Sequence, residues 1–187
     1  MLIACPLDDD FEDSQLADPA AGFRMSGHRL TVIGLEGGRE VPGTRGQVRA
    51  RTDSGIGDVD PADSGALFLP GGSSPDHLRA DRRCVAIAGQ MVDAERPVLA
   101  ICHGPQLLLT ADAVRGRRTT AWKTVKGDLR HAGAVVVDEK VVVDGNLVPS
   151  RQPSDLPDFI RESLVVLGAG AAPPSAAGPT PDRLVPS

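Results

Sequence analysis

The sequence contains no tyrosine, one tryptophan and four phenylalanines, so aromatic residues make up only 3% of its 187 residues. Few aromatic side chains leave few platforms on which nucleic-acid bases could stack. Basic residues are also in the minority, with 20 lysines and arginines against 25 acidic residues and a net charge of -5. An acidic chain does not attract phosphate backbones or anionic lipids. We therefore expect neither nucleic acid nor a membrane as a partner.

Long apolar runs and paired cysteines are absent as well. No stretch approaches the roughly 18 apolar residues that a membrane span needs, and the first residues are typical of a core strand rather than a signal peptide. The three cysteines, Cys5, Cys84 and Cys102, show no CxxC spacing, which argues against a disulfide framework and a zinc site. These absences predict a cytoplasmic protein with reduced thiols and with no metal or other cofactor.

Apolar segments of strand length alternate with segments of helical periodicity along most of the chain. The predicted strands are residues 2–5, 29–35, 66–69, 98–101, 119–122 and 147–150. The predicted helices are residues 11–26, 75–94, 106–111, 123–132 and 154–167. Such alternation is typical of a mostly parallel sheet covered by helices on both faces.

Two segments depart from this alternation. Residues 135–137 and 141–143 are short valine-rich runs that precede strand 147–150, and residues 144–146 supply turn chemistry. This part therefore predicts a small hairpin inserted into the α/β pattern. From residue 168 to the end, alanine, glycine, proline and serine predominate, which predicts a disordered tail at 168–187. The sequence therefore predicts one domain over residues 1–167.

One predicted strand ends on a cysteine. The run 98–101 is followed by Cys102, His103, Gly104 and Pro105, which is typical of a buried strand that turns sharply into a helix. Hydrolases expose a nucleophile at such an elbow, and the helix N-terminus behind it favours a thiolate. The backbone N–H of His103 would then point toward an oxyanion, and its imidazole is suited to accept the thiol proton. The alternative is a buried structural cysteine beside a surface histidine.

Two further loops end at the same edge of the predicted sheet. Gly71 and Gly72 follow strand 66–69, and glycine lets a backbone N–H approach a reacting carbonyl closely; the alternative is a simple turn. Glu12 follows the first strand within an acidic run. Its carboxyl would tune Cys102 by sharing the thiol proton. The alternative for Glu12 is stabilisation of a first helical turn.

Four motifs, in this order, resemble the intracellular protease I (PfpI) family of the class I glutamine amidotransferase-like superfamily. They are residues 10–13, 69–72, 100–106, and 142–148 with Ser150 and Arg151. The resemblance extends over residues 1 to about 165. It implies a flavodoxin-like α/β sandwich with three layers and no cofactor.

The resemblance also implies roles for particular residues. Cys102 would be the nucleophile, Glu12 would be hydrogen-bonded to it, and the backbones of Gly72 and His103 would form an oxyanion hole. It further implies a dimer or hexamer. In such an oligomer a carboxylate from a neighbouring subunit would pair with His103 and complete a catalytic triad. The matching position is Asp76, where the family usually has glutamate.

The predicted oxyanion and substrate-binding residues are Gly71, Gly72, Gly104 and Trp122. Trp122 would wall the pocket, and the alternative for it is simple packing. Two departures from the family pattern surround this pocket: Arg45 stands where a histidine is common, and Ala121 precedes Trp122 where a serine is usual.

The activities that the resemblance implies all use a thiolate that attacks an electrophilic carbon. They include peptide hydrolysis, removal of glyoxal or methylglyoxal adducts from proteins, glyoxalase-like chemistry and chaperone-like protection. We predict a stress-protective cysteine hydrolase, a peptidase or deglycase, acting on peptides or small carbonyl adducts. The alternative is a non-hydrolytic redox sensor or chaperone-like protein whose Cys102 is oxidised. Isocyanide hydration is a third alternative, for which other residues around Glu12 are expected.

Overall fold

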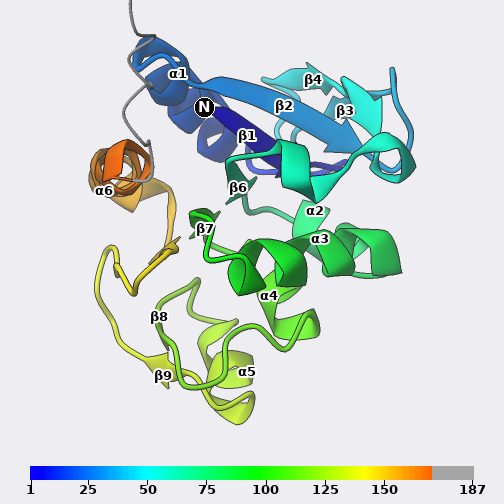
Figure 1. The fold of residues 1–187 in the computed structure, drawn as a ribbon. Helices are drawn as coiled ribbons and strands as arrows, with labels where there is room; N and C mark the ends of the chain where they lie inside the picture. The colour runs from blue at the N-terminus through cyan, green and yellow to red at the C-terminus, as the bar shows by residue number, and fades with distance from the viewer. Residues whose placement is uncertain (170–187) are drawn as a thin grey trace, which may run out of the picture.

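A six-stranded parallel sheet forms the centre of the computed structural model, which describes residues 1–169 (Figure 1). The strand order is β10-β7-β6-β1-β2-β5, and every neighbouring pair is parallel. The strands are β1 (Leu2–Pro6), β2 (Arg29–Gly34), β5 (Ser54–Gly55), β6 (Ala66–Leu69), β7 (Val98–Ile101) and β10 (Leu147–Ser150). All residues of β6, β7 and β10 are buried, as expected for parallel strands covered on both faces.

Helices cover both faces of this sheet. On one side lie α1 (Asp13–Met25) and α6 (Leu156–Ala169), and on the other lie α2 (Ser74–Leu78), α3 (Arg82–Asp93), α4 (Pro105–Thr110) and α5 (Lys126–His131) (Figure 1). Phe68 of β6 packs between the first pair, with ring centroids 5.4 Å from Phe23 and 6.2 Å from Phe159. Met91, Leu107 and other side chains form a second core on the opposite face. The flavodoxin-like three-layer sandwich is confirmed.

The prediction of a single helix over residues 75–94 is wrong, because the chain forms α2 and α3 there. Asp81 has an extended backbone, and its side chain accepts the N–H of Arg83 at 2.8 Å. Aspartate is among the preferred residues for capping a helix N-terminus. A new helix therefore starts after Asp81, and the break leaves α2 as a short helix beside the carboxyl edge of the sheet.

The hairpin predicted within residues 135–150 is present in part, as an antiparallel turn at residues 144–146. β9 (Val135–Val136) pairs in parallel with β8 (Arg118–Thr119), and 141–143 forms no strand. Asp144 and Leu147 exchange backbone hydrogen bonds across the predicted turn, and Val141 forms an antiparallel bridge with Ser150, so this segment folds back on β10. A further antiparallel hairpin joins β3 (Glu40–Pro42) to β4 (Arg49–Arg51).

Other boundaries differ less from the predictions. Of the predicted strand 119–122, only Thr119 lies in a strand, β8. The predicted helix 123–132 begins three residues later than expected, as α5. Three short 3-10 helices, Ile56–Asp58, Pro61–Asp63 and Pro153–Asp155, complete the structure. The predicted tail 168–187 lies outside the described residues, except for its first two residues, which continue α6. Within residues 1–169, none of the helices has the length and apolar character of a membrane span.

Candidate active site

Cys102 lies at the turn between β7 and α4, with a φ of 62°. Residues other than glycine rarely adopt this left-handed conformation, so the surrounding structure must hold it. The Cys102 N–H donates to the Ser150 carbonyl oxygen, and its own carbonyl accepts the N–H of Trp122, both at 3.0 Å. Gly104 is required at this turn because a Cβ there would lie 2.3 Å from the carbonyl oxygen of Leu69. The elbow predicted from the sequence is present.

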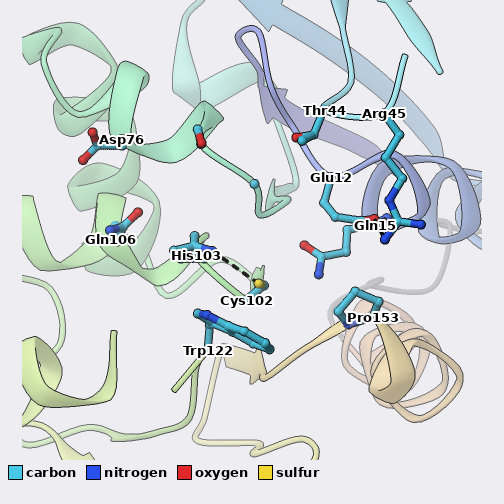
Figure 2. Close-up of a pocket in the computed structure, with 12 residues that line it drawn as sticks. Glu12, Gln15, Thr44, Arg45, Asp76, Cys102, His103, Gln106, Trp122 and Pro153 are labelled. Carbon is cyan, nitrogen blue, oxygen red and sulfur yellow. Dashed lines mark hydrogen bonds and ion pairs between the residues drawn. The ribbon is translucent and has the colours of Figure 1, made fainter. Parts of the chain in front are cut away.

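The side chains of Cys102 and His103 meet, although they are neighbours in the sequence. The Cys102 Sγ lies 3.4 Å from the His103 Nδ1 (Figure 2). The indole of Trp122 lies beside this pair, with its ring centroid 6.3 Å from that of the imidazole. An imidazole at this distance from a thiol can accept its proton.

Burial controls the protonation of this pair. It raises the pKa of the Cys102 thiol above its ordinary value, against the opposing effect of the Gln15 amide and of the backbone N–H groups of His103 and Gly72. Burial likewise lowers the pKa of His103. Both shifts favour a neutral thiol beside a neutral imidazole. The helix behind the elbow, α4, has only six residues, and a thiolate stabilised by its N-terminus stays a prediction.

Gly71 and Gly72 have different roles at the end of β6. Gly72 has a φ of 84°, and its N–H approaches the Cys102 sulfur together with the N–H of His103. These are the two backbone donors predicted for an oxyanion hole. The N–H of Gly71 instead donates to the Gln15 Oε1 at 3.0 Å, so it is already occupied.

Glu12 lines the same pocket, and its carboxylate caps α1. It accepts the backbone N–H of Gln15 at 3.0 Å and the hydroxyl of Ser14 at 2.5 Å. The Arg45 guanidinium lies 3.9 Å from its other oxygen. Among the hydrogen bonds of residues 1–169, none joins Glu12 to Cys102. The contact between the first helix and the thiol comes from Gln15, and Glu12 affects the thiol only through its charge, which raises the pKa of Cys102.

Asp76 projects from α2 on the far side of the pocket from Gln15 (Figure 2). Its carboxylate pairs with Arg79 at 2.6 Å, one helical turn away. The negative charge of Asp76 raises the pKa of His103, but burial has the larger effect. In the described part of the chain, no hydrogen bond joins Asp76 to His103 within the same subunit.

The pocket is a cavity of about 500 Å³. Its lining residues are Glu12, Gln15, Thr44, Arg45, Gly72, Ser73, Asp76, Cys102, His103, Gln106, Trp122 and Pro153. Trp122 forms part of the wall, as predicted. Sequence reasoning missed Gln15, Thr44, Gln106 and Pro153. Of these, only Gln15 could have been found from the sequence, because it lies three residues after Glu12 and therefore on the same side of a helix.

Thr44 and Arg45 reach the pocket because a buried carboxylate fixes their loop. Asp13 accepts the backbone N–H of Arg45 at 2.9 Å and that of Val48 at 2.7 Å. Gly43 packs directly on this carboxylate, since a Cβ there would lie 2.6 Å from it. Nothing in the sequence links positions 13 and 45. No group of three or more histidine, cysteine, aspartate or glutamate side chains in residues 1–169 is placed to hold a metal ion.

Comparison with known proteins identifies relatives of this chain. The sequence profile described as "DJ-1/PfpI family" matches residues 1–165. The chain is 48% identical to the "Protein/nucleic acid deglycase 2" of Escherichia coli over 89% of this chain and 98% of that protein. It is also 48% identical to the "General stress protein 18" of Bacillus subtilis, over 84% of this chain and 92% of that one.

A solved structure has the same fold. It is a two-domain protein of Anabaena variabilis with a dj-1/thij/pfpi-like and a ferritin-like domain. The two structures superpose with a TM-score of 0.88 at 32% identity, over 96% of this chain. The present chain spans about half of that protein, 53% of its length. The profile match over nearly the whole described chain and the close relatives lead to one assignment: this chain belongs to the DJ-1/PfpI family.

Proposed function

We propose that the protein is a stress-protective, cysteine-dependent hydrolase that acts on carbonyl adducts of proteins or on peptides. The observation that carries the proposal is the contact of 3.4 Å between the Cys102 Sγ and the His103 Nδ1 at the wall of an open pocket. The relatives named as a deglycase and a general stress protein support the same reading. We further propose that it works in the cytoplasm.

For a peptide or other amide substrate, the proposed reaction begins with attack of the Cys102 sulfur on the acyl carbon. The S–C bond forms, the thiol proton moves to the His103 Nδ1, and the carbonyl electron pair moves onto oxygen. That oxygen is held by the N–H groups of Gly72 and His103. When the C–N bond breaks, the leaving amine takes the proton from His103. Water, deprotonated by the same imidazole, then attacks the thioester, which releases the acid and returns the proton to sulfur.

We also propose that the active protein is a dimer or hexamer. His103 has no hydrogen-bonded carboxylate in its own subunit within residues 1–169, and an Asp76 carboxylate from a neighbouring subunit would complete a triad. Such a carboxylate would hold the imidazole in the tautomer that leaves Nδ1 free to accept the thiol proton. Analytical ultracentrifugation tests this proposal, and a purely monomeric active protein contradicts it.

One comparison tests the hydrolase directly. Wild type, Cys102→Ser and His103→Ala are assayed on fluorogenic peptides, methylglyoxal and methylglyoxal-glycated thiols, with Cys84→Ala as a control that removes a buried thiol of raised pKa, about 12, outside the pocket. We expect turnover in wild type and in the control, and loss in both site variants. If wild type shows no turnover above free cysteine while peroxide modifies Cys102 stoichiometrically, the redox alternative holds and the hydrolase proposal is wrong.

A further inference from the structure

Arg45 lines the pocket with a guanidinium group that is largely free of partners. Its side chain is 67% exposed. Within residues 1–169 its one ion-pair contact is the Oε1 of Glu12, at 3.9 Å, and the guanidinium donates no hydrogen bond there. A loose, exposed ion pair contributes little to stability. The five N–H donors of the guanidinium are therefore available to a molecule that enters the pocket.

The backbone that carries Arg45 is fixed from two sides. The Asp13 carboxylate accepts the Arg45 N–H at 2.9 Å. The preceding residue, Thr44, donates its N–H to the Phe11 carbonyl oxygen at 2.8 Å and its hydroxyl to the Asp10 carbonyl oxygen at 2.9 Å. A side chain on a fixed backbone loses less conformational freedom on binding than one on a mobile loop, so this loop favours the capture of a ligand.

Glu12 does not need Arg45 to compensate its charge. Its Oε2 already accepts the backbone N–H of Gln15 at 3.0 Å and the hydroxyl of Ser14 at 2.5 Å. It also caps the N-terminus of α1, a helix of 13 residues whose dipole favours a negative charge at that end. Arg45 therefore remains beside Glu12 and still offers its other N–H groups to a second anion.

The charges of the pocket are unevenly distributed. Among the lining residues, all of which belong to the described part of the chain, Arg45 is the only lysine or arginine. Figure 2 shows Arg45 on the Gln15 side of the pocket, across Cys102 from Asp76. An anionic group on a bound substrate is attracted by Arg45 and repelled by Asp76. This charge difference orients such a substrate along the pocket, with its reacting carbon between the two ends.

We propose that Arg45 is a specificity-determining residue that binds a carboxylate of the substrate, so that the pocket selects acidic peptides or acidic carbonyl adducts. The carboxylate belongs either to the end of a short peptide or to an acidic side chain beside the reacting group. In both cases its two oxygens match the N–H fork of arginine. The inference deepens the proposed function and rests on it, because it names the substrate class of the same site.

A matched pair of alkylating labels tests this selectivity without turnover. N-iodoacetylglycine and N-iodoacetylglycinamide alkylate a thiol by the same displacement of iodide, and they differ only in a carboxylate against a neutral amide. Mass spectrometry gives the rate at which each label modifies Cys102 at a fixed neutral pH. The carboxylate preference is the ratio of the two rates, divided by the same ratio for N-acetylcysteine amide in solution. The pKa of the thiol cancels in this ratio.

We expect wild type to have a higher carboxylate preference than the free thiol, and Arg45→Gln to lower it about tenfold, the effect of one charge-assisted hydrogen bond. A second pair of labels, the N-iodoacetyl derivatives of glutamic acid α-amide and of glutaminamide, places the carboxylate on a side chain instead. The pair with the larger preference shows whether the pocket takes a chain-terminal or a side-chain carboxylate.

Two further variants separate contact from general charge. Arg45→Lys keeps the charge but loses the planar fork, so an intermediate preference is expected. Arg49 lies on β4 outside the pocket lining, and its side chain is also 67% exposed. Arg49→Gln therefore removes the same charge at equal exposure, and we expect it to change the preference by less than about twofold, because salt screens distant charges. Thermal melting reports on folding, and Arg45→Lys decides if Arg45→Gln does not fold.

A wild-type preference no higher than that of the free thiol for both label pairs overturns the inference. So does a preference that is unchanged in Arg45→Gln, or one that falls equally in Arg49→Gln. The hydrolase proposal is tested separately by turnover of peptides and glycated thiols. Turnover without carboxylate preference overturns the role of Arg45 alone, whereas the preference without turnover supports Arg45 and overturns the hydrolase.

Discussion

The carboxylate of Asp13 accepts the backbone N–H of Arg45 at 2.9 Å, across 32 positions of sequence. Because Asp13 is buried at 3% exposure and also holds Val48, the first turn of α1 fixes the loop that brings Thr44 and Arg45 to the pocket. Burial raises the pKa of Asp13, but the backbone donors outweigh this effect and hold the pKa below its usual value. Asp13 is thus a charged anchor of the pocket rim.

Replacement of Asp13 tests the anchor. Asp13→Ala leaves the part-buried N–H groups of Arg45 and Val48 without their charged acceptor, and we expect it to lower the free energy of unfolding by about 2–3 kcal/mol. Urea denaturation measures this change. Asp93→Ala, at an exposed position near the end of α3, is the matched control and is expected to change stability by less than about 0.5 kcal/mol. Equal effects of the two substitutions would contradict the anchor.

The same carboxylate predicts a dependence of stability on acid. A lowered pKa in the folded state means that the ionised form contributes stability above the unfolded pKa of about 3.9, and that this contribution disappears as pH falls through the folded value. We therefore expect the difference in stability between wild type and Asp13→Ala to shrink as pH falls below about 4. Urea denaturation at several pH values measures it. A difference that stays constant into strong acid would exclude a charged Asp13 as the source.

Gly104 and Gly127 predict opposite effects of the same substitution. A Cβ at Gly104 would lie 2.3 Å from the Leu69 carbonyl oxygen, whereas a Cβ at Gly127 in α5 would meet no atom within 4 Å. We expect Gly104→Ala to destabilise by about 2 kcal/mol or more and to displace Cys102. Gly127→Ala should stabilise by about 0.5 kcal/mol, because alanine loses less entropy in a helix. Thermal or chemical denaturation compares the two, and a tolerated Gly104→Ala would contradict the close approach at the elbow.

The left-handed backbone of Cys102 predicts that a glycine variant is more stable than an alanine variant there, the reverse of the usual order. At a φ of 62° alanine is strained and glycine is not. We expect Cys102→Gly to be more stable than Cys102→Ala by about 1 kcal/mol, with both inactive. Cys84 lies inside α3, so the same pair of substitutions there should follow the ordinary order, with alanine more stable. Denaturation of the four variants distinguishes a strained elbow from a relaxed turn.

The protonation states of Cys102 and His103 predict how the activity depends on pH. Burial raises the pKa of Cys102 and lowers that of His103, so both are neutral at pH 7. We expect kcat/KM to depend on a neutral imidazole and to fall only below about pH 6.5, the ordinary pKa of histidine. The alkylation midpoint of Cys102 should lie above the value of about 8.5 for free cysteine. A midpoint well below that value would mean that the pair exists as thiolate and imidazolium.

Local sequence patterns determine how much of this site could be predicted. The apolar run before Cys102 and the Gly104 and Pro105 after it define the strand, the elbow and the helix within a few residues. These elements could therefore be predicted from the sequence. The alternation of strands and helices likewise predicts the parallel sheet. Asp81, by contrast, caps the start of a second helix after α2 has ended at Leu78, and the apolar residues on both sides of this break were interpreted as one helix.

Contacts between distant segments account for what was missed. The choice between Glu12 and Gln15 as the neighbour of the thiol depends on where Gly71 lies against α1, and no local pattern contains that information. The position of Arg45 depends on Asp13 in the same way. Val135 and Val136 have strand composition, but no local pattern shows that they pair in parallel with β8. These features depend on tertiary packing, which the secondary-structure preferences of the local sequence do not determine.

The bond from the Cys102 N–H to the Ser150 carbonyl has a consequence for synthesis on the ribosome. Ser150 belongs to β10, which follows β7 by more than forty residues. A nascent chain that has emerged only as far as α4 holds its cysteine in a turn with no such support. Cys102 therefore gains this support for its strained backbone only when β10 has docked on β7, late in the synthesis of the chain.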